Sequence, residues 1–350
     1  SKRKPPEIKF APANPYEEGE INLQDSKNPV DIALAAHFES LGLKPAKRCS
    51  DSVFIRRATL DLTGRIPSPE RLEAFLDDES PNKREKLVDE LLASDEFVNY
   101  MSLRLGDILR IKAEFPINLW PNAAQAYTRF IRKSLSDGLG WDEMARRMLS
   151  SSGSNFRVGE VNFLRAMQSR TPESTASCAA LTFMCARYDK IPEERRKAFA
   201  SFFSRVGYKS TKEWKEEIVF DDPSKRAPFV SVFPDGSAAV FSADMSVRAG
   251  FAEWLTKRGN PYFSKAFANR VWTWIFGTPI VSPVDDMFFS GNRPVSARLL
   301  ETLAEKFERS GFDIRALIRT IALSEAYSQS FIPEPSNNPE AAAKSFAVDP

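Results

Sequence analysis

Signals that start and end helices recur along most of this chain, and few segments alternate as strands do. Ser68-Pro69 places a capping serine before a first-turn proline, and Ser80-Pro81 repeats the signal before an apolar stripe. Gly42 and Gly64 follow apolar residues at helical spacing, where glycine commonly ends a helix. The spacing predicts helices over 31–43, 52–62, 69–76, 83–93, 98–111, 123–135, 141–149, 172–187, 192–203, 247–256, 261–276, 297–307 and 314–323. We therefore predict a mainly α-helical protein.

The period changes between two helical stretches. Residues 229–233 and 238–241 are β-prone runs on either side of Pro234-Asp235-Gly236-Ser237, which predicts a β-hairpin. Residues 218–220 are a candidate third strand. The expected fold is two packed helical regions with a small β-hairpin insert between them. We divide the chain into an extended arm (1–27), a helical domain (28–207), a connector with the hairpin (208–245), a second helical domain (246–331) and a tail or linker (332–350).

The two ends look unlike the rest of the chain. Prolines at 5, 6, 12 and 15 predict an arm that is ordered only where something holds it. Prolines at 333, 335 and 339 interrupt any helix after 331, and 341–350 shows no hydrophobic face, so we expect a linker there and a shortened C-terminus. Such ends are typical of a subunit embedded in a larger assembly.

Residue counts exclude several kinds of active site. His37 is the single histidine, which excludes a His-rich zinc site and leaves one residue on which a Ser-His-Asp triad would depend. Three cysteines cannot form a disulfide framework or a four-thiolate metal site. Neither GxGxxG nor GxxxxGKS occurs, so nucleotide binding is not expected. We predict no cofactor and no metal.

Charge and hydropathy limit the partners. Lys+Arg 49 against Asp+Glu 47 leaves a net charge of +2, which gives no long-range field to recruit nucleic acid. No apolar run approaches the roughly 20 residues that a transmembrane helix needs. The sequence therefore predicts neither a nucleic-acid partner nor a transmembrane segment.

Asp285-Asp286 is the most prominent acidic pair and the weak candidate for catalysis. Adjacent carboxylates suit a hard cation or a general acid and base. They also suit loop structure and an ion pair with Arg270, which is the interpretation we favour.

Arg56-Arg57 and Asp61 allow a similar choice. Arg57 and Asp61 are four residues apart, so on a helix they share a face and can pair. The adjacent arginines suit instead a clamp on a ligand carboxylate or sulfate. We favour the ion pair.

Trp272 stands in an aromatic segment with Trp274 and Phe276. Aromatic faces can stack on sugar rings, but this spacing within a helix favours core packing. Cys178 and Cys185, about two turns apart on a helix, are expected to be small buried hydrophobes. A disulfide from Cys49 to one of them stays open for an exported protein.

Several spaced segments resemble two families of unknown function found in tandem, families 1549 and 1553. Residues 54–67 (FIRRATLDLTGRIP) and 83–94 (KREKLVDELLAS) resemble the opening of family 1549. Residues 260–263 (NPYF), 269–272 (NRVW), 276–277 (FG), 283–286 (PVDD), 311–313 (GFD) and 317–321 (LIRTI), with Ser324 and Tyr327, resemble family 1553. The resemblance implies an exported protein of planctomycete or verrucomicrobial type, often linked to a planctomycete cytochrome C-like domain.

This chain departs from that resemblance at one motif. Relatives often carry Cys-Ala-x-Cys-His after an Asn-Phe-x-Arg-Ala segment, which residues 162–166 match. Here Cys185 keeps its place, Tyr188 replaces the second thiol and Asp189 replaces the histidine. Cys-x-x-Cys-His is the haem attachment pattern, so we expect this degenerate motif to have lost that chemistry.

Three functions follow as hypotheses, the first of which we favour. The first is a non-catalytic periplasmic or cell-surface module that binds other envelope proteins or glycans, as a subunit of a hetero-oligomeric complex. Alternatively the chain is a carbohydrate-active hydrolase or glycan-binding protein, or a degenerate relative of a haem-linked electron-transfer protein. The envelope location is implied by the resemblance alone, since the charged residues at 2–4 are not followed by the hydrophobic stretch typical of a signal peptide.

Overall fold

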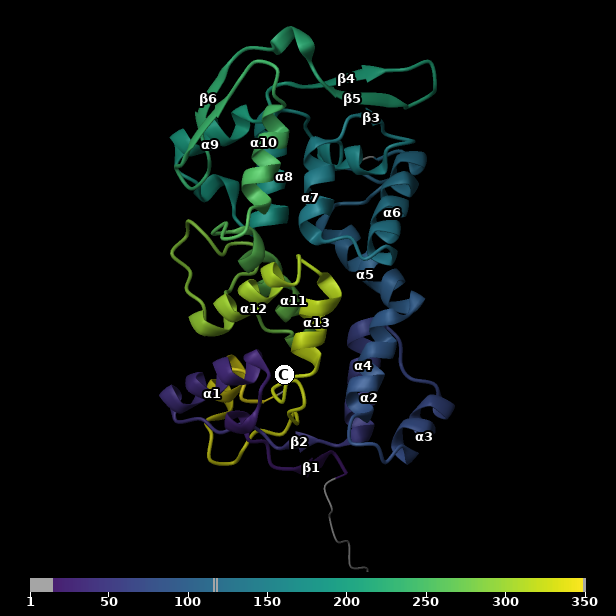
Figure 1. Cartoon of the computed structure of the whole chain (residues 1–350), viewed down its shortest axis with the longest axis vertical. Coiled ribbons are helices and arrows are strands. Elements are labelled where there is room, and N and C mark those ends of the chain that lie inside the picture. Colours follow the sequence, from purple (N-terminus) through teal and green to yellow (C-terminus); the bar gives the residue numbers. More distant parts are fainter. Residues whose placement is uncertain (1–14, 116, 118, 349–350) are drawn as a thin grey trace, which may run out of the picture.

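The chain runs up one side of an elongated body and returns down the other (Figure 1). The computed structural model describes residues 15–115, 117 and 119–348. Helices dominate and strands are few and short, which confirms the mainly α prediction. The helices are α1 (Pro29–Leu41), α2 (Asp51–Thr63), α3 (Pro69–Asp77), α4 (Lys83–Ala93), α5 (Asp95–Ile108), α6 (Pro121–Ser136), α7 (Trp141–Ser150), α8 (Pro172–Met184), α9 (Glu193–Ser201), α10 (Val247–Thr256), α11 (Phe263–Phe276), α12 (Ala297–Arg309), α13 (Ile314–Ala322) and α14 (Pro339–Lys344).

Local capping explains where several helices begin and end. The Ser68 hydroxyl accepts a hydrogen bond from the backbone N–H of Arg71, and Pro69 occupies the first turn of α3. Gly64 ends α2 with a left-handed φ of 68°. A β-carbon at Gly64 would lie 2.6 Å from the Tyr100 ring, so both the backbone and the neighbouring ring require glycine there.

The predicted hairpin is present as β6 (Phe229–Val232) and β7 (Ala238–Phe241), which pair antiparallel. The candidate third strand also forms, as β5 (Glu217–Asp221), but it belongs to another sheet. It lies between β4 (Val206–Ser210) and β3 (Gly153–Ser154). β3 lies in the predicted helical domain (28–207), and β4 crosses the boundary of that domain with the connector (208–245). Strands of two and five residues leave little periodic signal in the sequence.

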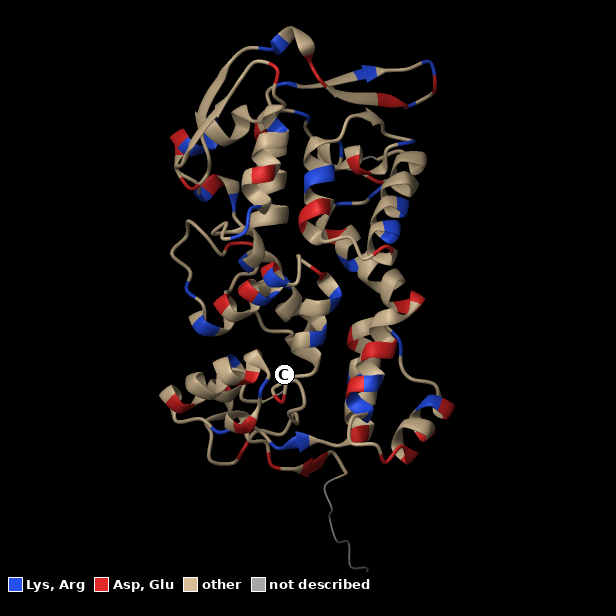
Figure 2. Ribbon diagram, in the orientation of Figure 1, with Lys and Arg blue, Asp and Glu red and all other residues tan. Residues whose placement is uncertain are grey.

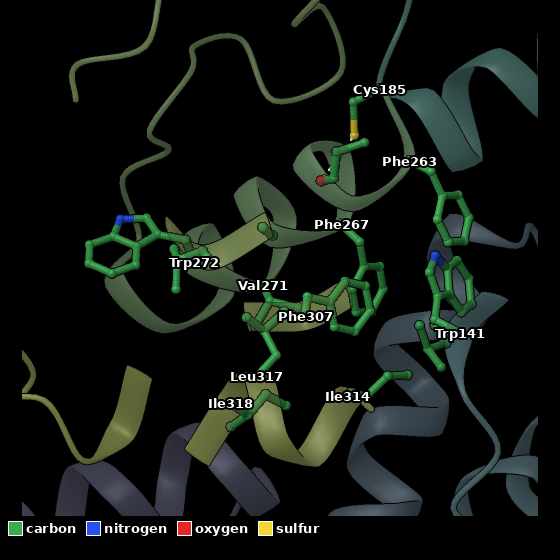
Figure 3. Close-up of a cluster of buried hydrophobic side chains, with 14 of the residues drawn as sticks. Trp141, Cys185, Phe263, Phe267, Val271, Trp272, Phe307, Ile314, Leu317 and Ile318 are labelled. Carbon is green, nitrogen blue, oxygen red and sulfur yellow. Dashed lines mark hydrogen bonds between the residues drawn. The ribbon is translucent and has the colours of Figure 1, made fainter. Parts of the chain in front are cut away.

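One aromatic core joins the two helical regions. The Trp141 ring, at the start of α7, lies 4.8 Å from the Phe267 ring of α11 between centroids, and 6.5 Å from the Phe263 ring. Phe267 in turn stacks on Phe307 of α12 at 5.1 Å. Figure 3 shows these rings side by side, with Ile314 and Leu317 of α13 nearby. The two regions therefore share buried surface.

The N-terminal arm is held against the body over the part that the structure describes. Residues 1–14 of the expected arm lie outside that part. Beyond them, β1 (Glu17–Gly19) pairs with β2 (Arg48–Cys49), and Ile21 and Leu23 are buried. The β1–β2 pairing and the burial of Ile21 and Leu23 thus hold this part of the arm, which is the condition under which we expected it to be ordered.

The C-terminal tail is also part of the core, so the linker prediction is wrong. Residues 339–344 form α14, and Phe346, Ala347 and Val348 are buried. The Phe346 ring lies 5.1 Å from that of Trp272 in α11. The buried amide of Gln329 donates to the carbonyl oxygen of Phe346. The tail shows no hydrophobic stripe in its sequence because most of its buried apolar residues come after α14 instead of repeating along that helix.

Phe346→Ala should lower the free energy of unfolding by roughly 3–5 kcal/mol, the usual cost of emptying a buried phenylalanine site. Chemical denaturation of the whole chain measures this. Phe115→Ala is the matched control, since Phe115 is 78% exposed and its removal should cost under about 0.5 kcal/mol. Equal stability of the two variants would show that the tail is not docked.

Candidate functional site

Two sets of residues that the sequence singled out meet in one pocket. A cavity of about 370 Å³ lies between the end of α8 with its following loop and the loop that precedes α12. We call it the Asp285 pocket. Its lining residues are Ser177, Leu181, Ala186, Arg187, Tyr188, Asp189, Pro283, Asp285 and Asp286.

Arg270 connects the Asp285 pocket to the core. Its Nη2 donates to Oδ1 of Asp285 at 2.6 Å, which confirms the predicted pair. The same guanidinium donates to the carbonyl oxygens of Thr182 (2.9 Å) and Leu181 (3.2 Å) in the last turn of α8. These carbonyls have no partner within a helix, so the buried arginine satisfies them and ties α8 to α11.

The two aspartates differ in their surroundings. The Asp285 side chain is 60% exposed although its arginine partner is only 5% exposed. The Asp286 carboxylate accepts a hydrogen bond from the Ser290 hydroxyl at 2.6 Å. The backbone carbonyl oxygen of Asp286 accepts another from the side-chain amide of Asn292. Asp286 therefore shapes its own loop. Within the described residues, no three His, Cys, Asp or Glu side chains are grouped to hold a metal ion.

The degenerate motif is divided between core and pocket. Cys185 ends α8 with a left-handed φ of 46°, and its thiol is buried 3.6 Å from the carbonyl oxygen of Ala266. Figure 3 shows the sulfur directed toward α11. Tyr188 and Asp189 line the pocket instead; the Tyr188 hydroxyl donates to the carbonyl oxygen of Arg196 at 2.8 Å. Burial raises the pKa of the Cys185 thiol to about 11, which suppresses the reactive thiolate.

Arg57 and Asp61 both contact a third residue, Tyr327. The Arg57 guanidinium lies 4.2 Å from the centre of the Tyr327 ring, and the Tyr327 hydroxyl donates to Asp61 at 2.7 Å. Arg57 also donates to the carbonyl oxygen of Gln329. Arg56 is exposed on another face of α2, so the structure does not bring the two arginines together as a clamp.

The tryptophan that we considered for sugar stacking is inaccessible. Trp272 is fully buried, and its ring stacks on Phe276 at 3.9 Å. Sequence reasoning missed two accessible tryptophans, Trp120 and Trp214, which line a larger cleft of about 700 Å³. The available signal was a lone aromatic, Trp214, inside the charged run 212–217 that we treated as a connector.

Arg270→Ala should destabilise the protein by about 3 kcal/mol, because it leaves two buried carbonyl oxygens without a partner and opens a cavity. Asp285→Asn should cost under about 1 kcal/mol, since the exposed carboxylate is well solvated. Denaturant titration of both variants tests this. A larger loss for Asp285→Asn would assign the structural role to the aspartate.

Cys185 should resist alkylation by iodoacetamide at pH 8 in the folded protein, because burial and its pKa of about 11 leave little thiolate. Peptide mass mapping before and after unfolding measures this, with the half-buried Cys178 as internal comparison. Rapid native labelling of Cys185 at the rate of an exposed thiol would show that the site opens.

No helix in the described part of the chain is long and apolar enough to span a bilayer.

Comparison with known proteins gives two consecutive family matches. The family described as protein of unknown function DUF1549 (PSCyt2) matches residues 29–208, and protein of unknown function DUF1553 (PSD1) matches residues 247–349. Neither the curated proteins nor the solved structures contain a match. The suspected resemblance is confirmed: the chain belongs to the DUF1549 family, with a DUF1553 segment following in tandem.

Proposed function

We propose that this chain is a non-catalytic interaction module of the cell envelope or extracellular space that acts as a subunit of a larger assembly. The observation that carries the proposal is an exposed apolar face on the β6–β7 hairpin. Val230 and Val240 are directly paired across the two strands and are 78% and 69% exposed. Val232 continues the same face.

The inner face of this hairpin is anchored, so the outer face is presented rigidly. Phe229 packs on Phe202 at 5.2 Å and on Phe241 at 6.0 Å. The hairpin lies at the upper end of the body (Figure 1), and among the described residues β6 and β7 form a sheet of only two strands. Contiguous exposed apolar residues on an ordered element commonly mark protein-binding surfaces.

The charged candidates support a structural role over catalysis. Asp285 pairs with the arginine that ties α8 to α11, and Asp61 binds Tyr327 in the core. Figure 2 shows Lys, Arg, Asp and Glu interspersed over the molecule, consistent with the near-neutral net charge. The envelope location rests on family resemblance. The electron-transfer alternative has less support, because the buried Cys185 thiol contacts the carbonyl oxygen of Ala266 in α11 and does not line the pocket with Tyr188 and Asp189.

Native mass spectrometry of the protein isolated gently from its source should show stoichiometric partners, and Val230→Lys/Val240→Lys should remove them. Two charges on the apolar face oppose its desolvation but leave the anchored inner face intact, so the melting temperature should stay unchanged. Leu103→Lys, on a residue 70% exposed on α5, is the matched control that should keep its partners.

Three results would contradict this proposal. The first is a bare monomer from the source, and the second is the retention of partners by the double variant. The third is substrate turnover that disappears in Asp285→Asn without loss of stability.

A further inference from the structure

The cleft between Trp120 and Trp214 has no role in the function proposed above. Trp120 lies just before α6, and Trp214 lies in the turn that joins β4 to β5. They are 42% and 72% exposed, in a cleft of about 700 Å³, within the size range of ligand sites. Two large aromatic side chains from separate elements are thus left in contact with water around one concave surface.

The polar groups of the cleft are fixed in place. Arg165, which is only 7% exposed, donates to Oε2 of Glu217 from Nε (3.0 Å) and Nη2 (2.7 Å), while Arg170 donates to Oε1 at 2.8 Å. Glu216 accepts from the hydroxyl groups of Ser154 and Thr211. Because the fold already holds these side chains in place, ordering them when a ligand binds would cost little conformational entropy.

The chemistry of the lining indicates a ligand that both donates and accepts hydrogen bonds and carries little charge. Four basic side chains (Arg165, Arg170, Lys212, Lys215) and three acidic ones (Glu213, Glu216, Glu217) line the cleft, so their charges nearly cancel. Arginine offers only donors and glutamate only acceptors. Sugar hydroxyls serve both, and the apolar faces of pyranose rings can stack on indole rings. A proline-rich peptide would also stack, but proline has no N–H for the carboxylates.

We propose that the Trp120–Trp214 cleft binds a neutral oligosaccharide chain of pyranose units. Trp120 and Trp214 supply the stacking surfaces, and Arg170 and the exposed Glu213 supply hydrogen bonds to ring hydroxyls. This site is separate from the hairpin face, so either can fail without the other.

Two of the three carboxyl groups in the cleft, those of Glu216 and Glu217, are poorly suited to hydrolysis. Glycoside cleavage needs one protonated carboxylic acid to donate to the leaving oxygen. Hydrogen bonds from Ser154 and Thr211 lower the pKa of Glu216. Burial opposes ionisation of Glu217, but hydrogen bonds from Arg170 and Arg165 outweigh it and lower its pKa as well. The lowered pKa values favour the ionised form of Glu216 and Glu217, which does not suit either of them to act as that acid.

The test is isothermal titration of the whole chain with cello-, xylo-, manno- and chitohexaose, with heparin and decaproline as comparison ligands. We expect saturable binding of at least one neutral hexasaccharide and no release of reducing ends. Trp214→Ala and Trp120→Ala should each weaken it about tenfold or more, whereas Trp214→Tyr and the remote Leu103→Ala should stay within about threefold. The melting temperature of each variant verifies folding.

Three outcomes would overturn the proposal. These are no binding of any neutral hexasaccharide at millimolar concentration, binding that neither tryptophan variant weakens, or binding of only heparin or only decaproline. Because the hairpin variants leave the cleft intact, they should bind the same oligosaccharide with unchanged affinity.

Discussion

Stacking of Trp141 on Phe267 is the contact on which the rest of the structure depends. The two rings lie 4.8 Å apart at 26°, and they come from the DUF1549 and DUF1553 segments respectively. Phe267 also stacks on Phe307 of α12, and the Phe263 ring packs edge-on against Phe312. Since α11 is buried along most of its length, removing either segment would expose an aromatic surface to water. In this chain the two family segments therefore depend on one shared core.

Helices and local pairs could be predicted from the sequence because their signals are local. Serine caps, first-turn prolines and terminal glycines lie within a few residues of the ends that they define, as at Ser68 and Gly64. The Arg270–Asp285 pair was also predictable, since a buried arginine requires an acceptor and the acidic pair follows closely.

The features that the sequence did not predict depend on distant partners. Phe346 is buried because Trp272, far away in the chain, offers a surface, and no pattern within the tail records this. β5 lies in the sheet between two strands that both precede it in sequence, β3 and β4, and its own residues do not identify them. Trp120 and Trp214 stay exposed while Trp272 does not, a difference set by packing rather than by residue type. The candidate residues thus divide into charges that pair within the fold and apolar or aromatic side chains that stay exposed.

The most direct test of a shared core is hydrogen exchange with mass spectrometry, on the wild type and on Trp141→Ala in mild denaturant. If the two family segments form one cooperative unit, the variant should accelerate exchange in α7 and equally in α11 and α12. Acceleration confined to the segment that contains residue 141, with α11 and α12 still protected as in the wild type, would contradict this account.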